Sequence, residues 1–267
     1  MNRQIAIAIG AHPDDIEFGM SGTLLLLKQA GFRIHYLTLA SGNCGSTKYG
    51  AAALRKIRAR EARMAARILG ATYHPPIVDD LEIVYSVKLL RSLAAVIRRV
   101  RPAIVLTHSP QDYMEDHTET CRLAVTATFA RGMPNFKTTP ACPAADYEVT
   151  LYHALPHGLC DSLGSRVTPS AFVNTTSVQG VKRAALAAHK SQQNWLNASQ
   201  KMNSFLLAME RTSLEVGRMS AKFKFAEGWR RHLHLGFCRE DSDPLRDTLG
   251  RNYLINKTYQ RSLCPKS

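Results

Sequence analysis

A short apolar segment that runs directly into a His-Pro-Asp-Asp turn constrains this chain more than any other feature. Residues 5–9 are apolar and predict a buried strand, and the run Ala-His-Pro-Asp-Asp at 11–15 follows it where a helical pattern begins. Open α/β proteins bind ligands where a strand ends and a helix starts. His12 and Asp15, three residues apart, can grip one divalent metal ion, which leaves Asp14 free to handle a proton.

Strands and helices alternate along the chain, and the crossover helices imply parallel pairing. We therefore predict an α/β fold. The expected strands are 5–9, 33–40, a short strand around Tyr73, 103–107, 147–155 and 171–175. The expected helices are 15–30, 51–69, 87–100, 178–192 and 196–216. We expect one domain over residues 1–240, followed by a basic C-terminal tail or surface wrap over 241–267, where no clear periodicity is seen.

A second polar cluster, residues 108–117, follows the expected strand 103–107. Because parallel strands bring their carboxyl ends to the same edge of a sheet, we expect this cluster to lie near the first one. His117 would then join His12 and Asp15 in a set of two histidines and one carboxylate, which leaves a catalytic zinc ion one open position. A purely structural alternative is that Asp14 and Glu17 form a capping box at the start of the helix.

Three motifs resemble the LmbE/PIG-L family of zinc-dependent N-deacetylases. They are A-H-P-D-D at 11–15, H-x-x-x-D-Y-x-x-D-H at 108–117 and A-H-K-S-Q at 188–192, in that order. The resemblance implies a Rossmann-like fold, in which a mostly parallel sheet has helices on both faces. It also implies hydrolysis of the acetyl group from an amino sugar of the N-acetylglucosamine type.

The resemblance extends to roles for individual residues. It implies Zn²⁺ held by His12, Asp15 and His117, with Asp14 as the general base. A metal ion would lower the pKa of bound water, and Asp14 would take up its proton. Another divalent transition metal is an alternative, because a mixed nitrogen and oxygen site accepts several ions.

One position departs from the family pattern. Many members carry a histidine three residues before the last ligand, where this chain has Met114, and a thioether cannot donate a hydrogen bond. His108 and His189 are the two candidates for this catalytic role. His189 also fits a buried core position on a helix, so both interpretations stay open.

Three further residues are expected to bind substrate: Arg58, Asn43 and Gln192. Arg58 has the alternative of a solvated helix residue, as is usual for long basic side chains. Asn43 lies in a glycine-rich loop that is expected to face the first motif. Cys44 lies in the same loop and is a less favoured candidate nucleophile.

Composition narrows the choice of partners. Lys and Arg number 35 against 21 Asp and Glu, which gives a net charge of +14. We interpret this excess as a solvated basic surface, because no nucleic-acid-binding module is recognised, and nucleic acid is not an expected partner. No apolar segment has the length of a membrane span, and the N-terminus lacks a signal peptide, so we expect a soluble cytoplasmic protein.

The expected partner is therefore a small N-acetylated sugar or glycoconjugate, and a homo-oligomer is left open. Two other functions are consistent with the same residues. One is a hydrolase that acts on another amide, such as that of a natural product. The other is a non-catalytic basic binding protein that retains the fold.

Overall fold

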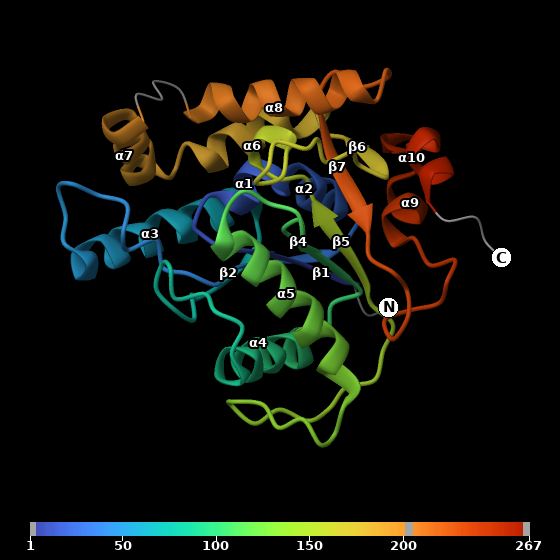
Figure 1. Cartoon of the computed structure of the whole chain (residues 1–267), viewed down its shortest axis with the longest axis horizontal. Coiled ribbons are helices and arrows are strands. Elements are labelled where there is room, and N and C mark those ends of the chain that lie inside the picture. Colours follow the sequence, from blue (N-terminus) through green and yellow to red (C-terminus); the bar gives the residue numbers. More distant parts are fainter. Residues whose placement is uncertain (1–3, 201–204, 264–267) are drawn as a thin grey trace.

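One mixed sheet with helices on both faces makes up the core of the protein, in a computed structural model that describes residues 4–200 and 205–263 (Figure 1). In the described residues the sheet has eight strands in the order β3-β2-β1-β4-β5-β7-β6-β8. The strands are β1 (Ile5–Gly10), β2 (Arg33–Thr38), β3 (Thr72–His74), β4 (Ile104–Thr107), β5 (Thr150–Ala154), β6 (Ala171–Asn174), β7 (Ala226–Arg231) and β8 (Tyr253–Ile255). Strands β1 to β5 are parallel, whereas β7 is antiparallel to β5 and β6, and β8 is antiparallel to β6. The predicted α/β class with a mostly parallel sheet is confirmed.

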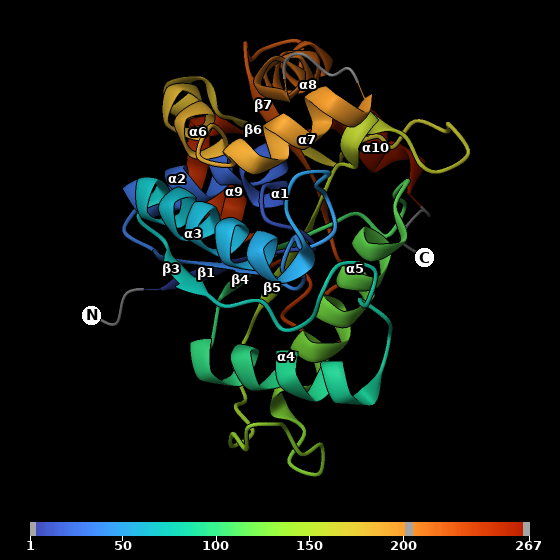
Figure 2. The same ribbon diagram turned by 90° about the vertical axis from the view of Figure 1, so that its left-hand side faces the viewer.

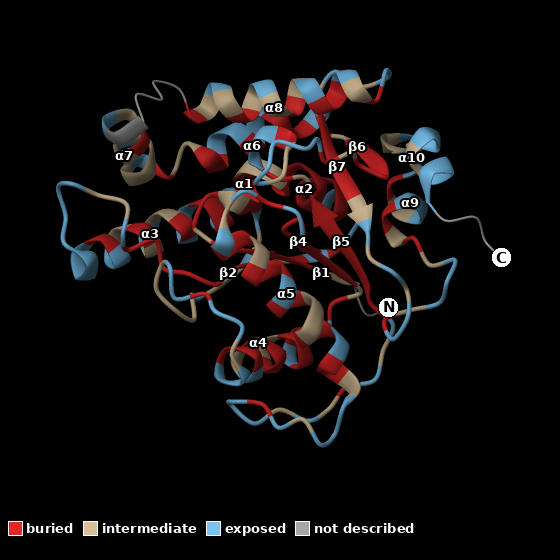
Figure 3. Cartoon of the chain, viewed as in Figure 1, coloured by how far each residue is buried: buried red, intermediate tan, exposed pale blue. Residues whose placement is uncertain are grey.

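The helices cover both faces of the sheet (Figure 2). One layer contains α2 (Ser21–Gln29), α3 (Ala51–Leu69), α6 (Gln179–Leu186) and α9 (Pro244–Leu249), and the other contains α4 (Val87–Val100) and α5 (Glu115–Phe129). Successive side chains of a strand point to opposite faces, so Ala6 and Ala8 pack against the first layer, and Ile7 and Ile9 against the second. The central strands are accordingly buried on both sides (Figure 3).

Two helices expected from the sequence are each broken in the structure. The expected helix 15–30 is divided at Met20 into α1 (Asp15–Gly19) and α2. The expected helix 178–192 ends with α6 at Leu186, and α7 (Lys190–Gln200) begins after it. The expected helix 196–216 therefore starts inside α7, and α8 (Phe205–Met219) supplies its later part, with residues 201–204 outside the described residues.

A distant glutamate caps each of these new helix starts. Glu227 accepts hydrogen bonds from the amides of Gly22 and Thr23, both at 2.8 Å, at the beginning of α2. Glu61 accepts hydrogen bonds from the amide and hydroxyl of Ser191 at the beginning of α7. Because the first four amides of a helix have no partner within the helix, a carboxylate fixed nearby favours a new helix start. Such tertiary contacts are invisible to local periodicity.

The C-terminal stretch 241–267 carries more structure than its lack of periodicity suggested. Its described part forms α9, β8 and α10 (Lys257–Ser262), and β8 adds a strand to the sheet beside β6. Asp243 caps α9 and accepts hydrogen bonds from the hydroxyls of Tyr152 and Tyr253, at 2.7 and 2.9 Å. These bonds tie the stretch to β5. No helix in the described part of the chain is both long and apolar enough to span a membrane.

Replacing Glu227 by alanine is expected to lower the free energy of unfolding by about 3–5 kcal/mol, because it leaves a charge buried without its partner. Lys182 is fully buried, and its ammonium group lies 2.6 Å from Glu227. Chemical denaturation measures the effect, and Glu227→Ala with Lys182→Met should recover part of the loss. The exposed pair of Arg166 and Glu215 provides the control, since Glu215→Ala should cost at most about 1 kcal/mol. Equal losses in Glu227→Ala and Glu215→Ala would contradict the prediction.

Candidate active site at the carboxyl edge of the sheet

The two polar clusters meet where β1 and β4 end. These strands are parallel neighbours, with Ile9 opposite Thr107, so the segments that follow them leave the same edge of the sheet. The amide of Ala11 donates a hydrogen bond to Nε2 of His108 at 2.9 Å, which links the two segments directly. The convergence expected from the sequence is therefore present in the structure.

His12, Asp15 and His117 present ligand atoms that all lie within 4.8 Å of one another. Nδ1 of His12 is 3.7 Å from Oδ2 of Asp15, and Nε2 of His117 is 3.5 Å from Oδ1 of the same carboxylate. Two imidazole nitrogens and a carboxylate oxygen are ligands that suit zinc and related divalent ions. One ion could be reached by all three residues.

Carboxylates orient both imidazoles. Nε2 of His12 lies 2.9 Å from Oδ2 of Asp116, and Nδ1 of His117 lies 3.0 Å from Oδ1 of Asp112. An ionised carboxylate only accepts hydrogen bonds, so these nitrogens are the donors, and in a neutral ring the opposite nitrogen offers its lone pair toward Asp15. Metal-binding histidines are typically held in this way.

The electrostatics of the cluster favour positive charge. Burial lowers the pKa of His12, but hydrogen bonds to Asp116 and Asp15 outweigh this and raise it to about 9. Burial also lowers the pKa of His117, and Asp15 and Asp112 raise it to about 10. Three carboxylates around two imidazoles leave surplus negative charge, which a divalent cation would neutralise. The donor atoms, their orientation and the charge thus fit a metal ion.

A second group of potential ligands overlaps the first and consists of His108, Asp112 and His117. Here Nε2 of His108 already accepts the Ala11 amide, and Oδ1 of Asp112 already accepts from His117. The ring of His108 stacks on that of His117, with centroids 4.1 Å apart. His108 lines the pocket, and its Nε2, which accepts the Ala11 amide, lies 3.2 Å from Oδ2 of Asp15. The N–H of its neutral ring is then on Nδ1, and its catalytic role stays a prediction.

Asp14 is the N-cap residue of α1, but its side chain makes no capping hydrogen bond and its backbone is strained. It is 5% exposed, and its φ of 111° lies in the left-handed region that non-glycine residues rarely adopt. Its Oδ2 makes no hydrogen bond with any described residue, and Nη2 of Arg58 lies 3.6 Å away. Burial raises the pKa of Asp14 to about 6, against the opposing effect of Arg58. A buried carboxylate with a free oxygen is chemically suited to accept a proton.

Arg58 is buried inside the site and is not solvated. Nη2 donates to the carbonyl of Pro13 at 2.6 Å, and the side chain lines the same pocket as Asp14. Gly42 has a φ of 78°, and a Cβ there would come within 2.4 Å of Nε of Arg58, so glycine leaves room for the guanidinium. Nε and Nη1 are buried and have no acceptor among the described residues.

The other predicted residues are placed differently. Gln192 lines the pocket, whereas Oδ1 of Asn43 accepts from the amide of Asp80 and joins two loops. His189 lies outside the pocket lining, and its Nε2 is 3.0 Å from Glu17 beneath α1. Substrate contact by Asn43 and catalysis by His189 stay predictions. Burial and nearby acids raise the pKa of the Cys44 thiol, which disfavours it as a nucleophile.

The pocket around these residues has a volume of about 450 Å³. Its lining includes residues that the sequence did not single out, because they belong to no charged motif: Phe18, Leu81, His157, Trp195 and Phe205. Phe18 packs against both His157 and Phe205, with ring centroids 4.8 and 5.8 Å apart. The site therefore has a polar floor and an aromatic wall.

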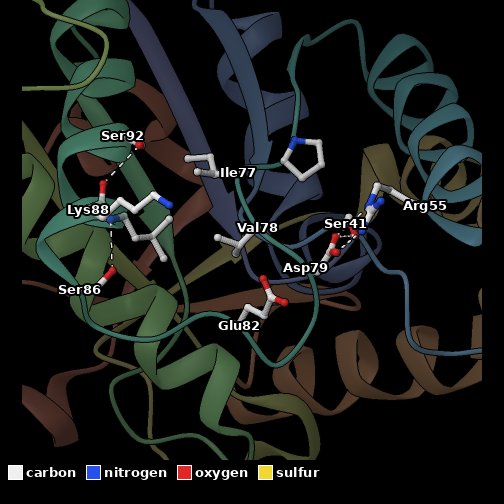
Figure 4. A pocket seen from close by; sticks show the side chains of 11 residues that line it. Ser41, Arg55, Ile77, Val78, Asp79, Glu82, Ser86, Lys88 and Ser92 are labelled. Carbon is white, nitrogen blue, oxygen red and sulfur yellow. Dashed lines mark hydrogen bonds and ion pairs between the residues drawn. The ribbon is translucent and has the colours of Figure 1, made fainter. Parts of the chain in front are cut away.

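A separate pocket of about 590 Å³ lies at the segment between β3 and α4 (Figure 4). It is lined by Ser41, Arg55, Asp79, Glu82 and Lys88, among others. Nε of Arg55 donates to Asp79 at 2.9 Å, and the hydroxyl of Ser41 donates to the same carboxylate. Neither group of potential metal ligands found in the described residues lies here.

Comparison with known proteins agrees with the motifs. The family model described as PIG-L, GlcNAc-PI de-N-acetylase, matches residues 7–128, which include both polar clusters. The diacetylchitobiose deacetylase of Thermococcus kodakarensis is 31% identical over 194 residues, which cover 70% of this chain and 69% of that protein. The chain belongs to the PIG-L family. The predicted family is confirmed.

Two further relatives show the extent of the similarity in sequence and in structure. A 4-oxalmesaconate hydratase of Pseudomonas putida is 29% identical over 201 residues, covering 71% of this chain and 74% of that protein. The structure of the N,N'-diacetylchitobiose deacetylase from Pyrococcus horikoshii has a TM-score of 0.72 at 23% identity, and covers 88% of this chain and 85% of that one. It shares the fold. Homologues of the chain include deacetylases, so the prediction of an enzyme is confirmed at the level of the family, which is generally metal-dependent.

Proposed function

We propose that the protein is a zinc-dependent deacetylase that removes the acetyl group from an amino sugar of the N-acetylglucosamine type or a related small N-acylated amine. The observation that carries this proposal is the buried carboxylate of Asp14, whose Oδ2 makes no hydrogen bond to a described residue, beside the convergent ligand atoms of His12, Asp15 and His117. Similarity to a diacetylchitobiose deacetylase supports an acetylated sugar as substrate.

His12, Asp15 and His117 would hold the metal ion, while Asp112 and Asp116 keep the two imidazoles in orientation. A divalent ion at this position supplies Lewis acidity, which polarises an acyl carbonyl and lowers the pKa of water.

Asp14 would carry out the proton transfers of the reaction. Hydrolysis forms a carbon–oxygen bond from water to the acyl carbon and breaks the carbon–nitrogen bond. Oδ2 of Asp14 would accept the proton that the attacking water loses, and the same proton would pass to the leaving nitrogen. The guanidinium of Arg58, 3.6 Å away, would hold the Asp14 carboxylate toward the pocket.

Hydration is the second candidate, because one relative is named a 4-oxalmesaconate hydratase. Deacetylation and hydration both need a water molecule activated toward a carbon atom, so a shared metal and base serve either reaction. The substrate then decides between them. Hydrolysis of a different amide and a non-catalytic binding role are the remaining alternatives.

Metal analysis combined with a substrate panel tests the proposal. Protein purified without added metal should contain about one divalent ion per chain. It should release acetate from N-acetylglucosamine, N,N'-diacetylchitobiose or N-acetylglucosamine glycosides. A chelator should abolish this release, and added Zn²⁺ should restore it.

Three other results would contradict deacetylation. Hydration of 4-oxalmesaconate without acetate release would favour the hydratase. Release of a different acid from an N-acylated natural product would assign another amide. Heparin binding without any metal-dependent turnover would favour a binding protein.

A further inference from the structure

Amide hydrolysis builds negative charge on the acyl oxygen, and a hydrogen-bond donor fixed toward this oxygen is typically worth 10²–10³ in kcat. Met114 lines the pocket next to the ligand cluster, where its thioether cannot donate. Nε2 of His108 is occupied by the Ala11 amide, and His189 lies outside the pocket against Glu17. Nε2 is therefore engaged in both histidines favoured from the sequence, by the Ala11 amide in His108 and by Glu17 in His189.

His157 is a further histidine in the pocket lining and lies outside both groups of potential metal ligands. It begins the short turn His157–Leu159 that follows β5, the parallel neighbour of β4, so it reaches the same edge of the sheet as the candidate ligands. His157 is exposed, and neither nitrogen of its ring makes a hydrogen bond to a residue that the structure describes. A neutral imidazole always carries one N–H, so His157 has a donor to offer whichever tautomer is present.

Aromatic contacts orient the His157 ring. The ring of Phe18 meets it edge-on at 4.8 Å and 62°, and the centroid of the Tyr113 ring lies 6.0 Å away. Tyr113 in turn packs edge-on against His117 at 5.6 Å. A continuous row of rings thus leads from the candidate metal ligands to His157. Ring contacts hold the imidazole without using either of its nitrogens.

The turn that carries His157 is fixed to the core. Leu159 is 5% exposed and packs with Phe172 and Val216. Its amide donates to the carbonyl of Pro156 at 3.0 Å, and its carbonyl accepts from the amide of Val167 at 2.9 Å. A side chain mounted on such a turn can hold a donor in place before the substrate binds.

We propose that His157 is a catalytic residue that donates a hydrogen bond to the acyl oxygen of the substrate as negative charge develops there. The inference rests on the proposed deacetylation. In this chain His157 supplies the donor that Met114 cannot.

Kinetics of His157 variants provide the first test, with the N-acetyl sugar that the wild-type protein hydrolyses fastest. His157→Phe should lower kcat about a hundredfold, because it keeps the ring packing and removes the donor, while KM changes less than about threefold. Bound metal should stay at the wild-type level. His234→Phe, outside the pocket lining, is the matched control and should keep wild-type kcat.

A stable mimic of the transition state gives a readout without turnover. The methylphosphonamidate analogue of N-acetylglucosamine carries tetrahedral oxygens where the acyl oxygen would be. His157→Phe should weaken its Kd about a hundredfold and leave the Kd of the glucosamine product unchanged. Introducing Met114→His into the His157→Phe variant should recover at least about tenfold in kcat, because it places an imidazole in the lining of the same pocket.

Four results would overturn the proposal: kcat of His157→Phe within about threefold of wild type, unchanged analogue binding, a rise in KM alone, or no recovery in the double variant. A large loss in Tyr113→Phe together with an unaffected His157→Phe would assign the donor to the Tyr113 hydroxyl instead. A failure of the proposed deacetylase function would give a different result from a failure of the His157 proposal. In that case the wild-type protein releases no acetate from any member of the panel.

Discussion

Asp14→Asn is expected to lower kcat for acetate release about a thousandfold and to leave the bound metal in place. General base catalysis typically contributes 10²–10⁴, and the amide of asparagine cannot take up the proton that Asp14 is proposed to accept. Asp14 belongs to neither group of potential metal ligands, so no ligand is removed.

The substitution is also conservative for the fold. Asp14 has a φ of 111°, and asparagine is among the residues that best tolerate positive φ. The side chain makes no capping hydrogen bond at the start of α1, so no cap is lost with the charge. The capping box considered for Asp14 and Glu17 is absent, because Glu17 bonds instead to Tyr36 and His189. A large loss of activity would therefore report on chemistry.

Steady-state kinetics and elemental analysis of the same sample measure the effect. Asp247→Asn provides the control, because this carboxylate is 63% exposed and pairs with Arg246 at the surface. Loss of metal together with activity would show that Asp14 is a ligand. Wild-type kcat in Asp14→Asn would refute its role as the base.

The placement of the ligand cluster could be predicted because parallel pairing determines it. Once 5–9 and 103–107 are recognised as parallel strands, the segments that follow must leave the same edge, and His12 and His117 converge. The spacing in the first motif also distinguishes the roles of its two aspartates. Asp15, three residues after His12, can share a metal ion with it, whereas Asp14 stays free of the ion. The polar floor of the site is thus encoded locally, in two short motifs.

The aromatic wall and the helix breaks depend on contacts between distant segments, which no local pattern contains. Glu227 caps α2 from more than 200 residues away in the sequence. Glu61, which lies in α3, caps α7 from 130 residues away. His157 carries no motif, and only the packing of Phe18 and Tyr113 around it shows that it belongs to the pocket. Strand β7 was missed because its Ala, Glu and Gly residues disfavour a strand locally.

His12→Ala and His117→Ala are each expected to abolish stoichiometric metal binding and, with it, acetate release. A catalytic zinc site has three protein ligands, and loss of one leaves too few to retain the ion. Elemental analysis after purification without added metal measures the loss directly. Thermal unfolding gives an independent readout, because an ion that binds only the folded state raises Tm in wild type by mass action. Added Zn²⁺ should leave the Tm of either variant unchanged.

His108→Ala distinguishes the two overlapping groups of potential ligands, since both contain His117. If His12, Asp15 and His117 hold the ion, His108→Ala should retain about one metal per chain, because His108 does not belong to that group and its Nε2 accepts the Ala11 amide. Loss of metal in His108→Ala with retention in His12→Ala would assign the group that includes Asp112. The nitrogen atoms of His12 argue against that outcome: Asp116 holds Nε2 at 2.9 Å, and Nδ1 is left facing Asp15, where a ligand lone pair is needed.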